Sequence, residues 1–123
     1  VPNLPQTRGL VSKALLGMMK ETAFLVNTSR GEVIDEPALT EALKDKQIKG
    51  AALDVFWEEP MPVNHPLMNM TNVILSPHCA GSTRESNVRI VTAAAQTVLD
   101  VLEGRVPPKQ YIYNREALRK ILL

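Results

Sequence analysis

The stretch Ala51-Ala52-Leu53-Asp54-Val55-Phe56 decides the fold of this chain, because it is apolar at every position except one carboxylate. Strands with a solvated face alternate between polar and apolar residues, whereas strands of a parallel sheet covered on both faces stay apolar throughout. Two similar runs flank it, Ala23-Phe24-Leu25-Val26-Asn27 earlier in the chain and Asn72-Val73-Ile74-Leu75-Ser76 later. We therefore expect three parallel strands, with both faces of their sheet covered.

Helical patterns precede the first two strands. Ser12 and Asp35 stand where each helix would begin, and both side chains accept hydrogen bonds from backbone N–H groups at a helix N-terminus. Pro37 falls in the first turn of the second helix, where proline is tolerated. The apolar positions are Leu15, Leu16 and Met19 in the first helix and Leu39, Ala42 and Leu43 in the second. Helices that alternate with apolar strands predict a layered α/β fold.

The longest helix is predicted after the third strand. Ser82 and Glu85 have the spacing of a capping box, and Gly104 is a natural terminator. Apolar residues recur between them in steps of three and four, with others alongside: Val88, Ile90, Val91, Ala94, Ala95, Val98, Val101 and Leu102. So wide a stripe predicts a helix buried on more than one side.

Composition narrows the classes of partner. The 123 residues are 45% hydrophobic, enough for one domain with a core. Fourteen basic and thirteen acidic residues leave a net charge of +1 without a basic block, so nucleic acid is not expected as a partner. No apolar run approaches the ~20 residues of a membrane span, so no membrane partner is expected either. The chain begins at Val1 rather than at methionine, and we expect a segment of a longer protein.

Cysteine and histidine are scarce in this chain. A single cysteine, Cys79, excludes an internal disulfide and a multi-cysteine metal site, and it fits a cytoplasmic location. The two histidines, His65 and His78, have no third ligand at a suitable spacing, so no metal site is expected. Cys79 is expected to be a small buried hydrophobic residue, and His65 to be structural.

Charged residues with complementary chemistry follow the three strands: Arg30, then Asp54 and Glu59, then His78. Ligands of open parallel sheets bind beyond the carboxyl ends of the strands, so all four can reach one rim. An arginine matches a substrate carboxylate in a bidentate way. A histidine gives a proton to a carbonyl oxygen as hydride reaches the carbon, and a carboxylate such as Glu59 stabilises and orients its ring.

Each of these residues also has a structural interpretation. Arg30 taken alone is a solvated loop charge, and Asp54 within an apolar strand is a hydrogen-bonded structural cap. Glu58, next to Glu59, is taken as simply exposed. Trp57 either shields the site or covers the loop. A thiol–imidazole dyad of His78 with the following cysteine is rejected, because successive residues of an extended segment point to opposite sides.

Three motifs in this order resemble the C-terminal signatures of the D-isomer-specific 2-hydroxyacid dehydrogenases. They are Leu25-Val26-Asn27-Thr28-Ser29-Arg30-Gly31, Gly50 to Phe56 with Glu59-Pro60, and Ser76-Pro77-His78-Cys79-Ala80-Gly81-Ser82-Thr83. The resemblance runs from Val1 to about Asn114. It implies a partial Rossmann-like, doubly wound parallel sheet, the C-terminal half of a dinucleotide-binding domain. On this basis we expect residues 1–106 to belong to the NAD(P)-binding domain and residues 107–123 to return to a substrate domain absent from this chain.

The resemblance implies an oxidoreductase that transfers a hydride between a nicotinamide cofactor and a 2-hydroxy acid/2-oxo acid pair. The cofactor would be NAD, with NADP not excluded, and the full-length protein would be a homodimer. Arg30 would bind the substrate carboxylate, His78 would be the acid/base and Glu59 its partner, while Asp54 would contact the nicotinamide carboxamide. The residues implied to line the cofactor are Thr28, Ser29, Arg30, Asp54, His78, Ala80 and Gly81.

The chain also departs from the family pattern. The family's G-x-G-x-x-G turn and the acidic residue that follows it do not occur here, and the six glycines are spread singly. Two other hypotheses therefore stay open. One is a dehydrogenase-like regulator that senses NAD(H) and recruits proteins, as corepressors that resemble this family do. The other is an inactive, truncated fragment.

Overall fold

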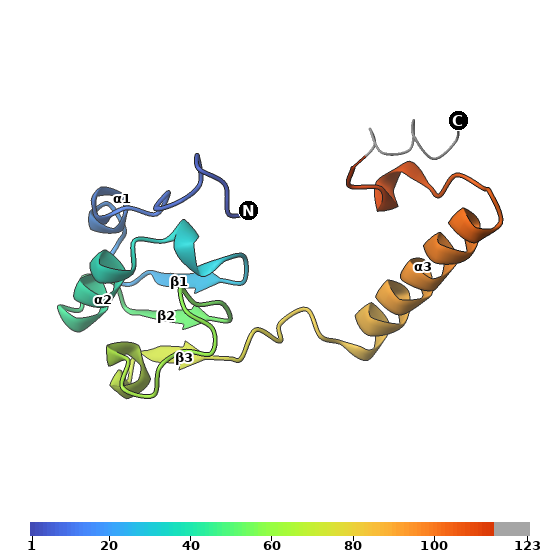
Figure 1. Cartoon of the computed structure of the whole chain (residues 1–123). Helices are drawn as coiled ribbons and strands as arrows, with labels where there is room; N and C mark the ends of the chain where they lie inside the picture. Colours follow the sequence, from blue (N-terminus) through green and yellow to red (C-terminus); the bar gives the residue numbers. More distant parts are fainter. Residues whose placement is uncertain (115–123) are drawn as a thin grey trace. The chain divides into compact units, whose positions relative to one another are not determined.

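The computed structural model describes residues 1–114, which fall into two compact units. The first unit, Val1–Ala80, contains the sheet and two helices, and the second, from Gly81, contains one long helix (Figure 1). Residues 115–123 lie outside the described part, so the tail predicted at 107–123 is described only as far as Asn114.

The sheet of the first unit is parallel, in the order β1-β2-β3. Strands β1 (Phe24–Asn27), β2 (Gly50–Leu53) and β3 (Val73–Leu75) occupy the three apolar runs, which confirms the α/β prediction. Helix α2 (Glu36–Lys44) joins β1 to β2, and a long loop with the short helix η2 (Pro66–Asn69) joins β2 to β3. All three strands are shorter than predicted.

Both predicted N-caps of the first unit are confirmed. Ser12 Oγ accepts from the Leu15 N–H at 3.4 Å at the start of α1 (Lys13–Gly17). Asp35 Oδ1 accepts from the Ala38 N–H at 3.1 Å at the start of α2. Both helices bury apolar side chains against one face of the sheet, in a cluster of Leu16, Ile34, Ala38, Leu39, Ala42, Leu43, Ile48, Ala51, Leu53 and Leu67.

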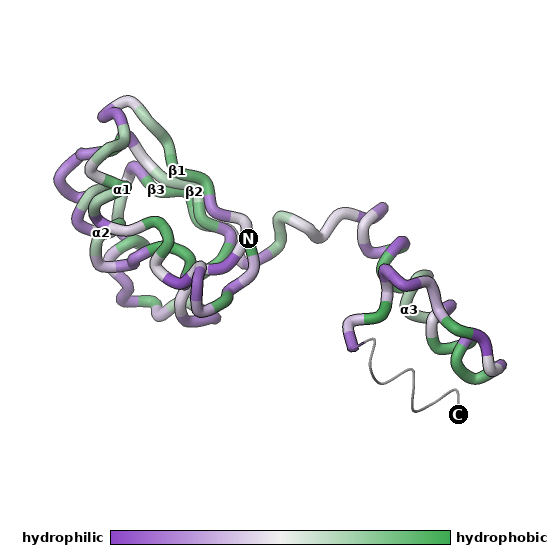
Figure 2. Tube along the Cα trace, turned by 90° about the horizontal axis from the view of Figure 1, so that it is seen from above, coloured by the Kyte–Doolittle hydropathy of each residue, from purple (hydrophilic) through white to green (hydrophobic). Residues whose placement is uncertain are grey.

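The opposite face of the sheet is open within this unit. Val26 and Ile74 lie in one row across the sheet and are 67% and 72% exposed, and Phe24 of the same face is 63% exposed. The expectation of cover on both faces is therefore wrong for this unit. An apolar run predicts that both faces of a strand are buried, but it does not predict which element covers them. The strands of this unit are hydrophobic along much of their length (Figure 2).

The second unit contains helix α3 (Arg84–Leu102). Its N-cap is Thr83 rather than Ser82, because Thr83 Oγ1 accepts from the Ser86 N–H at 3.1 Å. Gly104 ends the helix as predicted, with a φ of +72° in the left-handed region that favours glycine. The short helix η3 (Lys109–Tyr111) follows.

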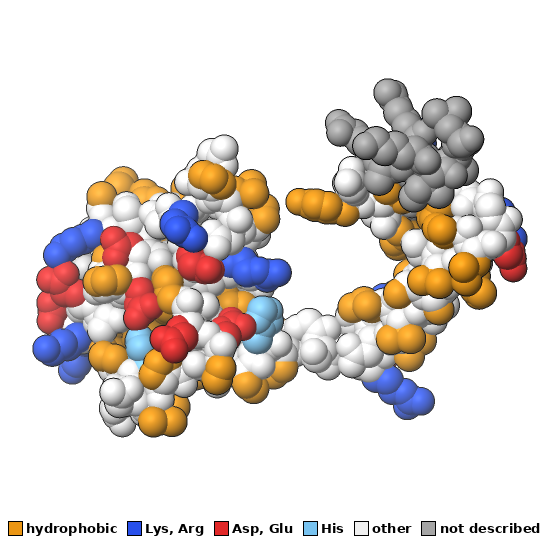
Figure 3. All heavy atoms as spheres, in the orientation of Figure 1, with side chains coloured by type: hydrophobic (Ala, Val, Ile, Leu, Met, Phe, Trp, Pro, Cys, Tyr) orange, Lys and Arg blue, Asp and Glu red, His pale blue; other side chains and the backbone are white. Residues whose placement is uncertain are grey.

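The apolar stripe of α3 is not buried. Val88, Val91 and Val98 are 60%, 67% and 58% exposed, and Asp100 is the only buried residue of this helix. Hydrophobic side chains therefore stand open to solvent along α3 (Figure 3). The predicted burial on more than one side is wrong within the described residues, since helical periodicity fixes which face is apolar but does not supply its partner. Among residues 1–114, no helix has both the length and the apolar character that a bilayer span requires.

Candidate active site

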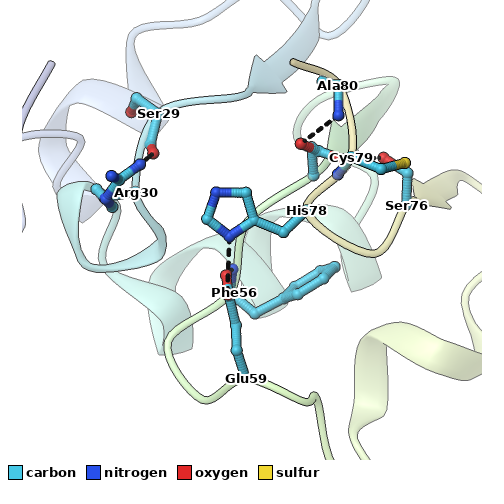
Figure 4. A network of polar contacts seen from close by, with 9 residues as sticks. Ser29, Arg30, Phe56, Glu59, Ser76, His78, Cys79 and Ala80 are labelled. Carbon is cyan, nitrogen blue, oxygen red and sulfur yellow. Dashed lines mark hydrogen bonds and ion pairs between the residues drawn. The ribbon is translucent and has the colours of Figure 1, made fainter. Parts of the chain in front are cut away.

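The loops that follow the three strands carry the charged residues predicted for the site (Figure 4). His78 Nδ1 lies 2.8 Å from Glu59 Oε2, so the loops after β2 and β3 meet in an imidazole–carboxylate hydrogen bond. The hydrogen bond with His78 mainly lowers the pKa of Glu59, and the charge of Arg30, in the loop after β1, adds a small lowering; Arg30 Nη1 itself donates to the Ser29 carbonyl at 2.6 Å. The structure thus brings Arg30, Glu59 and His78 to one edge of the sheet.

Asn27, at the end of β1, organises the loop that carries Arg30. Its Oδ1 accepts from the Ser29 N–H at 3.0 Å and from Ser29 Oγ at 2.9 Å, and its Nδ2 donates to the Arg30 carbonyl at 2.9 Å. The sequence interpretation did not single out this residue. The sequence does contain a signal for it, because a polar residue that ends an apolar strand needs hydrogen-bond partners. In the structure Asn27 is only 5% exposed.

Gly31 brings the Arg30 loop against the loop after β2. A Cβ at this position would lie 2.2 Å from the Phe56 carbonyl carbon and 2.5 Å from the Trp57 nitrogen. Real Cβ atoms do not approach backbone so closely, so only glycine allows the two loops to touch here. The spacing between Arg30 and the Glu59 loop therefore depends on this contact.

Asp54 holds the loop in which His78 stands. Its Oδ1 accepts from Ser76 Oγ at 2.6 Å and from the Cys79 N–H at 2.8 Å, and its Oδ2 accepts from the Ala80 N–H at 2.9 Å. The Ser76 hydroxyl first, and then the two backbone N–H groups, lower the pKa of this buried carboxyl. Both carboxylate oxygens of Asp54 are therefore hydrogen-bonded within the loops, and its contact with a cofactor stays a prediction.

His78 has an unusual backbone conformation, with a φ of +51°. A residue with a Cβ pays roughly 1–2 kcal/mol in this left-handed region, so the surrounding contacts must compensate. The hydrogen bonds from Cys79 and Ala80 to Asp54 supply that compensation immediately after the histidine. Backbone strain of this kind concentrates at functional sites.

Glu59 faces two donors. Its Oε1 accepts from the Phe56 N–H at 3.0 Å while its Oε2 meets the imidazole of His78. The hydrogen bond with His78 first, and then the one from Phe56, lower the pKa of this carboxyl, so it stays ionised near neutral pH. Glu58 beside it is exposed, as expected. Because Glu59 engages Nδ1, the ring is oriented and Nε2 is left to exchange a proton; within residues 1–114 no hydrogen bond uses Nε2.

A cavity of about 350 Å³ lies beside the Glu59–His78 pair. Its walls are mostly apolar, and its lining includes Phe56, Met61, Met68, Leu75 and Pro77. The His78 and Glu59 side chains are themselves 47% and 39% exposed, so solvent still screens the pair.

The remaining predicted cofactor residues differ in what they still offer. Thr28 is exposed and makes no hydrogen bond through its side chain within the described residues. The N–H groups of Ser29 and Ala80 are already used by Asn27 and Asp54, so they support the loops rather than point at a ligand. Gly81 is exposed and begins the second unit.

The expectation for Cys79 is wrong, because this residue is exposed. Its backbone N–H donates to Asp54 Oδ1 at 2.8 Å. No group of three His, Cys, Asp or Glu residues suited to a metal ion is found in the described part of the chain.

Residues 1–80 match the family described as "D-isomer specific 2-hydroxyacid dehydrogenase, NAD binding domain". The chain belongs to this family. A glyoxylate reductase from Thermofilum pendens is 46% identical over 119 residues, which are 97% of this chain and 34% of the relative. The chain thus spans about a third of the length of this relative.

Solved structures show the same fold. The NAD-complexed D-isomer specific 2-hydroxyacid dehydrogenase from Lactobacillus delbrueckii superposes with a TM-score of 0.81 at 30% identity, covering 91% of this chain and 38% of that one. The enzyme from Xanthobacter autotrophicus, solved with NADPH, gives a TM-score of 0.73 at 35% identity over 85% of this chain and 43% of that one. The partial Rossmann-like sheet predicted from the sequence is therefore confirmed.

Proposed function

We propose that this chain is the C-terminal part of the cofactor domain of an oxidoreductase that interconverts a 2-hydroxy acid and its 2-oxo acid with a nicotinamide cofactor. The hydrogen bond between Glu59 and His78, with Arg30 in the adjoining loop, carries the proposal. In this arrangement His78 is the proton donor and Arg30 is the group that binds the substrate carboxylate. Both lie at the edge of the sheet where ligands of this fold bind. Family membership and the relatives named above support the same conclusion.

Each residue has a separate task in this proposal. The guanidinium of Arg30 binds the substrate carboxylate and so places the neighbouring carbonyl group. His78, oriented through Nδ1, gives a proton from Nε2 to the carbonyl oxygen and takes one from the hydroxyl group in the reverse direction. Glu59 stabilises the protonated ring during both steps. When bound, the nicotinamide cofactor supplies or accepts the hydride.

The residues present fit the reacting end of such a cofactor. The loops after β1 and β3 flank the exposed imidazole, and Asp54 uses three of the roughly four acceptor positions of a carboxylate, which leaves one for a carboxamide N–H. Thr28, Ser29, Arg30, His78, Ala80 and Gly81 are proposed to line it. The glycine-rich turn for the pyrophosphate is not among the 123 residues, so these residues are not proposed to bind the phosphates.

The proposed substrates are small 2-oxo acids of the glyoxylate type. The relative that is 46% identical over nearly the whole chain is named a glyoxylate reductase, and this supports a short substrate. NAD is the proposed cofactor; NADP is retained as an alternative because structurally similar proteins have been solved with NAD and with NADPH.

Replacing His78 by Gln in the intact protein tests the proposal. Oxidation of NADH with glyoxylate should slow by roughly 100-fold to 10,000-fold, the usual contribution of general acid–base catalysis, while cofactor binding measured by calorimetry stays largely intact. Glu58→Gln is the matched control and should retain wild-type turnover. Unchanged turnover of His78→Gln would contradict the assignment. An intact protein that binds NADH but reduces no 2-oxo acid would instead support the regulatory hypothesis.

A homodimer and a cytoplasmic location also remain proposals. Light scattering of the intact protein would test the dimer, and fractionation of the source cells would test the location. The exposed, unpaired Cys79 supports a reducing compartment.

A further inference from the structure

The loop that carries Glu59 is attached at two points that flank this residue. On one side, Trp57 Nε1 donates to the Ile34 carbonyl at 2.8 Å. On the other side, His65 Nε2 lies 2.6 Å from Glu36 Oε1. One attachment ends just before α2 and the other on its first residue, so Trp57 anchors the loop.

His65 makes the second attachment with both ring nitrogens. Nδ1 accepts from the Leu67 N–H at 3.3 Å, which places the ring proton on Nε2, from where it is donated to Glu36. The side chains are only 14% and 29% exposed. Limited contact with water strengthens a hydrogen bond to a charged group, so this pair holds better than an exposed one would.

The segment that receives these attachments also begins with the substrate anchor. Arg30 is followed by η1 (Gly31–Val33), which packs its first residue against Phe56, and then by the acceptors Ile34 and Glu36. The anchor and the carboxylate partner of the acid/base are thus held by one continuous stretch of seven residues, 30–36.

Between these two attachments, Met61 packs against the core, but much of the loop is exposed. Glu58, Glu59 and Pro60 are exposed, and Val63 is 88% exposed. Ordering a residue costs on the order of 1–2 kcal/mol of conformational free energy, so an exposed loop keeps one conformation only where specific contacts fasten it.

We propose that Glu36 and His65 are a positioning pair, which holds the loop so that Glu59 keeps its contact with His78 at a set distance from Arg30. This role rests on the proposed function. Neither residue touches the reacting groups, and both act through Glu59. The site therefore depends also on Glu36, the first residue of α2, and on His65, the N-cap of η2.

The low pKa of the Glu59 carboxyl reports the positioning without any need for turnover. In ¹³C NMR titrations of this chain, His65→Ala and Glu36→Ala should raise the pKa of Glu59 towards the ordinary carboxyl value, because the contact with His78 is loosened. His65→Gln retains a donor in place of Nε2 and should restore most of the lowering. Glu41→Ala is the matched control, since it removes a contact with Lys13 from the same helix without touching the loop.

If the pair were purely structural, replacing either residue would lower stability but leave the pKa of Glu59 low in the molecules that remain folded. That result would overturn the proposal. Glu36 is partly exposed at the start of a helix, so its alanine variant keeps the test open if His65→Ala does not fold.

In the intact protein the same variants should reduce kcat by on the order of 10-fold to 100-fold, with little change in KM for the 2-oxo acid, because misplaced catalytic groups slow chemistry more than binding. A rise in KM alone would contradict the positioning role. If the wild-type protein shows no turnover, the proposed function fails, and the NMR titration still decides the role of the pair.

Discussion

Helices α2 and α3 both carry an apolar stripe, yet they differ in what the stripe contacts. In α2, Leu39 is fully buried and Leu43 is 1% exposed, in a core shared with Leu16 and the sheet. In α3, Val91 and Val98 are more than half exposed, although the apolar periodicity is as regular. The same kind of pattern therefore leads to a packed helix in one unit and to an open one in the other.

This difference shows that periodicity predicts a helix and its apolar face, but not whether another element packs against that face. Helix stability in proteins comes mainly from packing of that face. The contrast can be tested with paired substitutions in the two units.

The largest effect is expected from Leu39→Ala in α2. The cavity left in the core should lower the free energy of unfolding by about 2–5 kcal/mol. Urea unfolding followed by circular dichroism, with the fluorescence of Trp57 as the reporter of the first unit, measures it.

Val91→Ala in α3 is the matched substitution and should change stability by less than about 0.5 kcal/mol, as is usual for exposed positions. A loss comparable to that of Leu39→Ala would show that the stripe of α3 is buried within this chain and would remove the contrast.

The second pair compares two glycines. Gly31→Ala should destabilise the first unit by about 1–3 kcal/mol, because the new methyl group collides with the backbone of Phe56 and forces the loops apart. Gly81→Ala, in the second unit, meets no atom within 4 Å and should be close to neutral. Thermal unfolding of both variants measures the difference, and equal stability would contradict the close approach at Gly31.

The third prediction concerns how the stability of the first unit depends on pH. The pKa of Asp54 is lowered in the folded chain, so its contribution to stability is complete above the unfolded carboxyl value of about 3.9 and is lost as pH falls through the lower folded value. Asp54→Asn should remove this dependence and also reduce stability at neutral pH, because an amide cannot accept at both positions. Urea midpoints measured from pH 7 to pH 2 would show a flatter curve, and an unaltered slope would contradict the role of Asp54.

The smallest effect is expected at Asp100 in α3. Hydrogen bonds from Gln96 first and then from Arg105 lower its pKa, so the sign with pH is the same as for Asp54. Arg105 is half-exposed and lies 2.9 Å from Asp100, a separation comparable to the roughly 3 Å screening length of 1 M salt, so salt should raise the pKa of Asp100 only slightly. The pKa of Asp54, whose donors are uncharged, should respond less. Carboxyl ¹³C titrations at low and high salt compare the two, and equal responses would contradict these assignments.

Much of the site could be predicted from residues that follow strands. The sequence placed Arg30, Glu59 and His78 at one rim, and the structure confirms the contact between Glu59 and His78. The preference for Glu59 over Glu58 came from the resemblance to the family. The catalytic and cofactor roles of these residues stay predictions until turnover is measured.

The supporting contacts could not be predicted in the same way. Asn27 and Ser76 are single polar residues whose partners depend on how the strand ends lie beside each other. The left-handed backbone at His78 and the exposure of Cys79 are likewise not indicated by the neighbouring sequence.

Local chemistry was sufficient for the starts of α1 and α2 and for the three strands, because caps and apolar runs act over a few neighbouring residues. Packing in three dimensions decided the rest. The contact of His65 with Glu36 spans 29 positions of the chain. The close approach of Gly31 to Phe56 joins two loops that are far apart in the sequence. Such contacts arise only when many residues are placed together, which is why the sequence indicates the chemistry of this site while the tertiary structure sets its geometry.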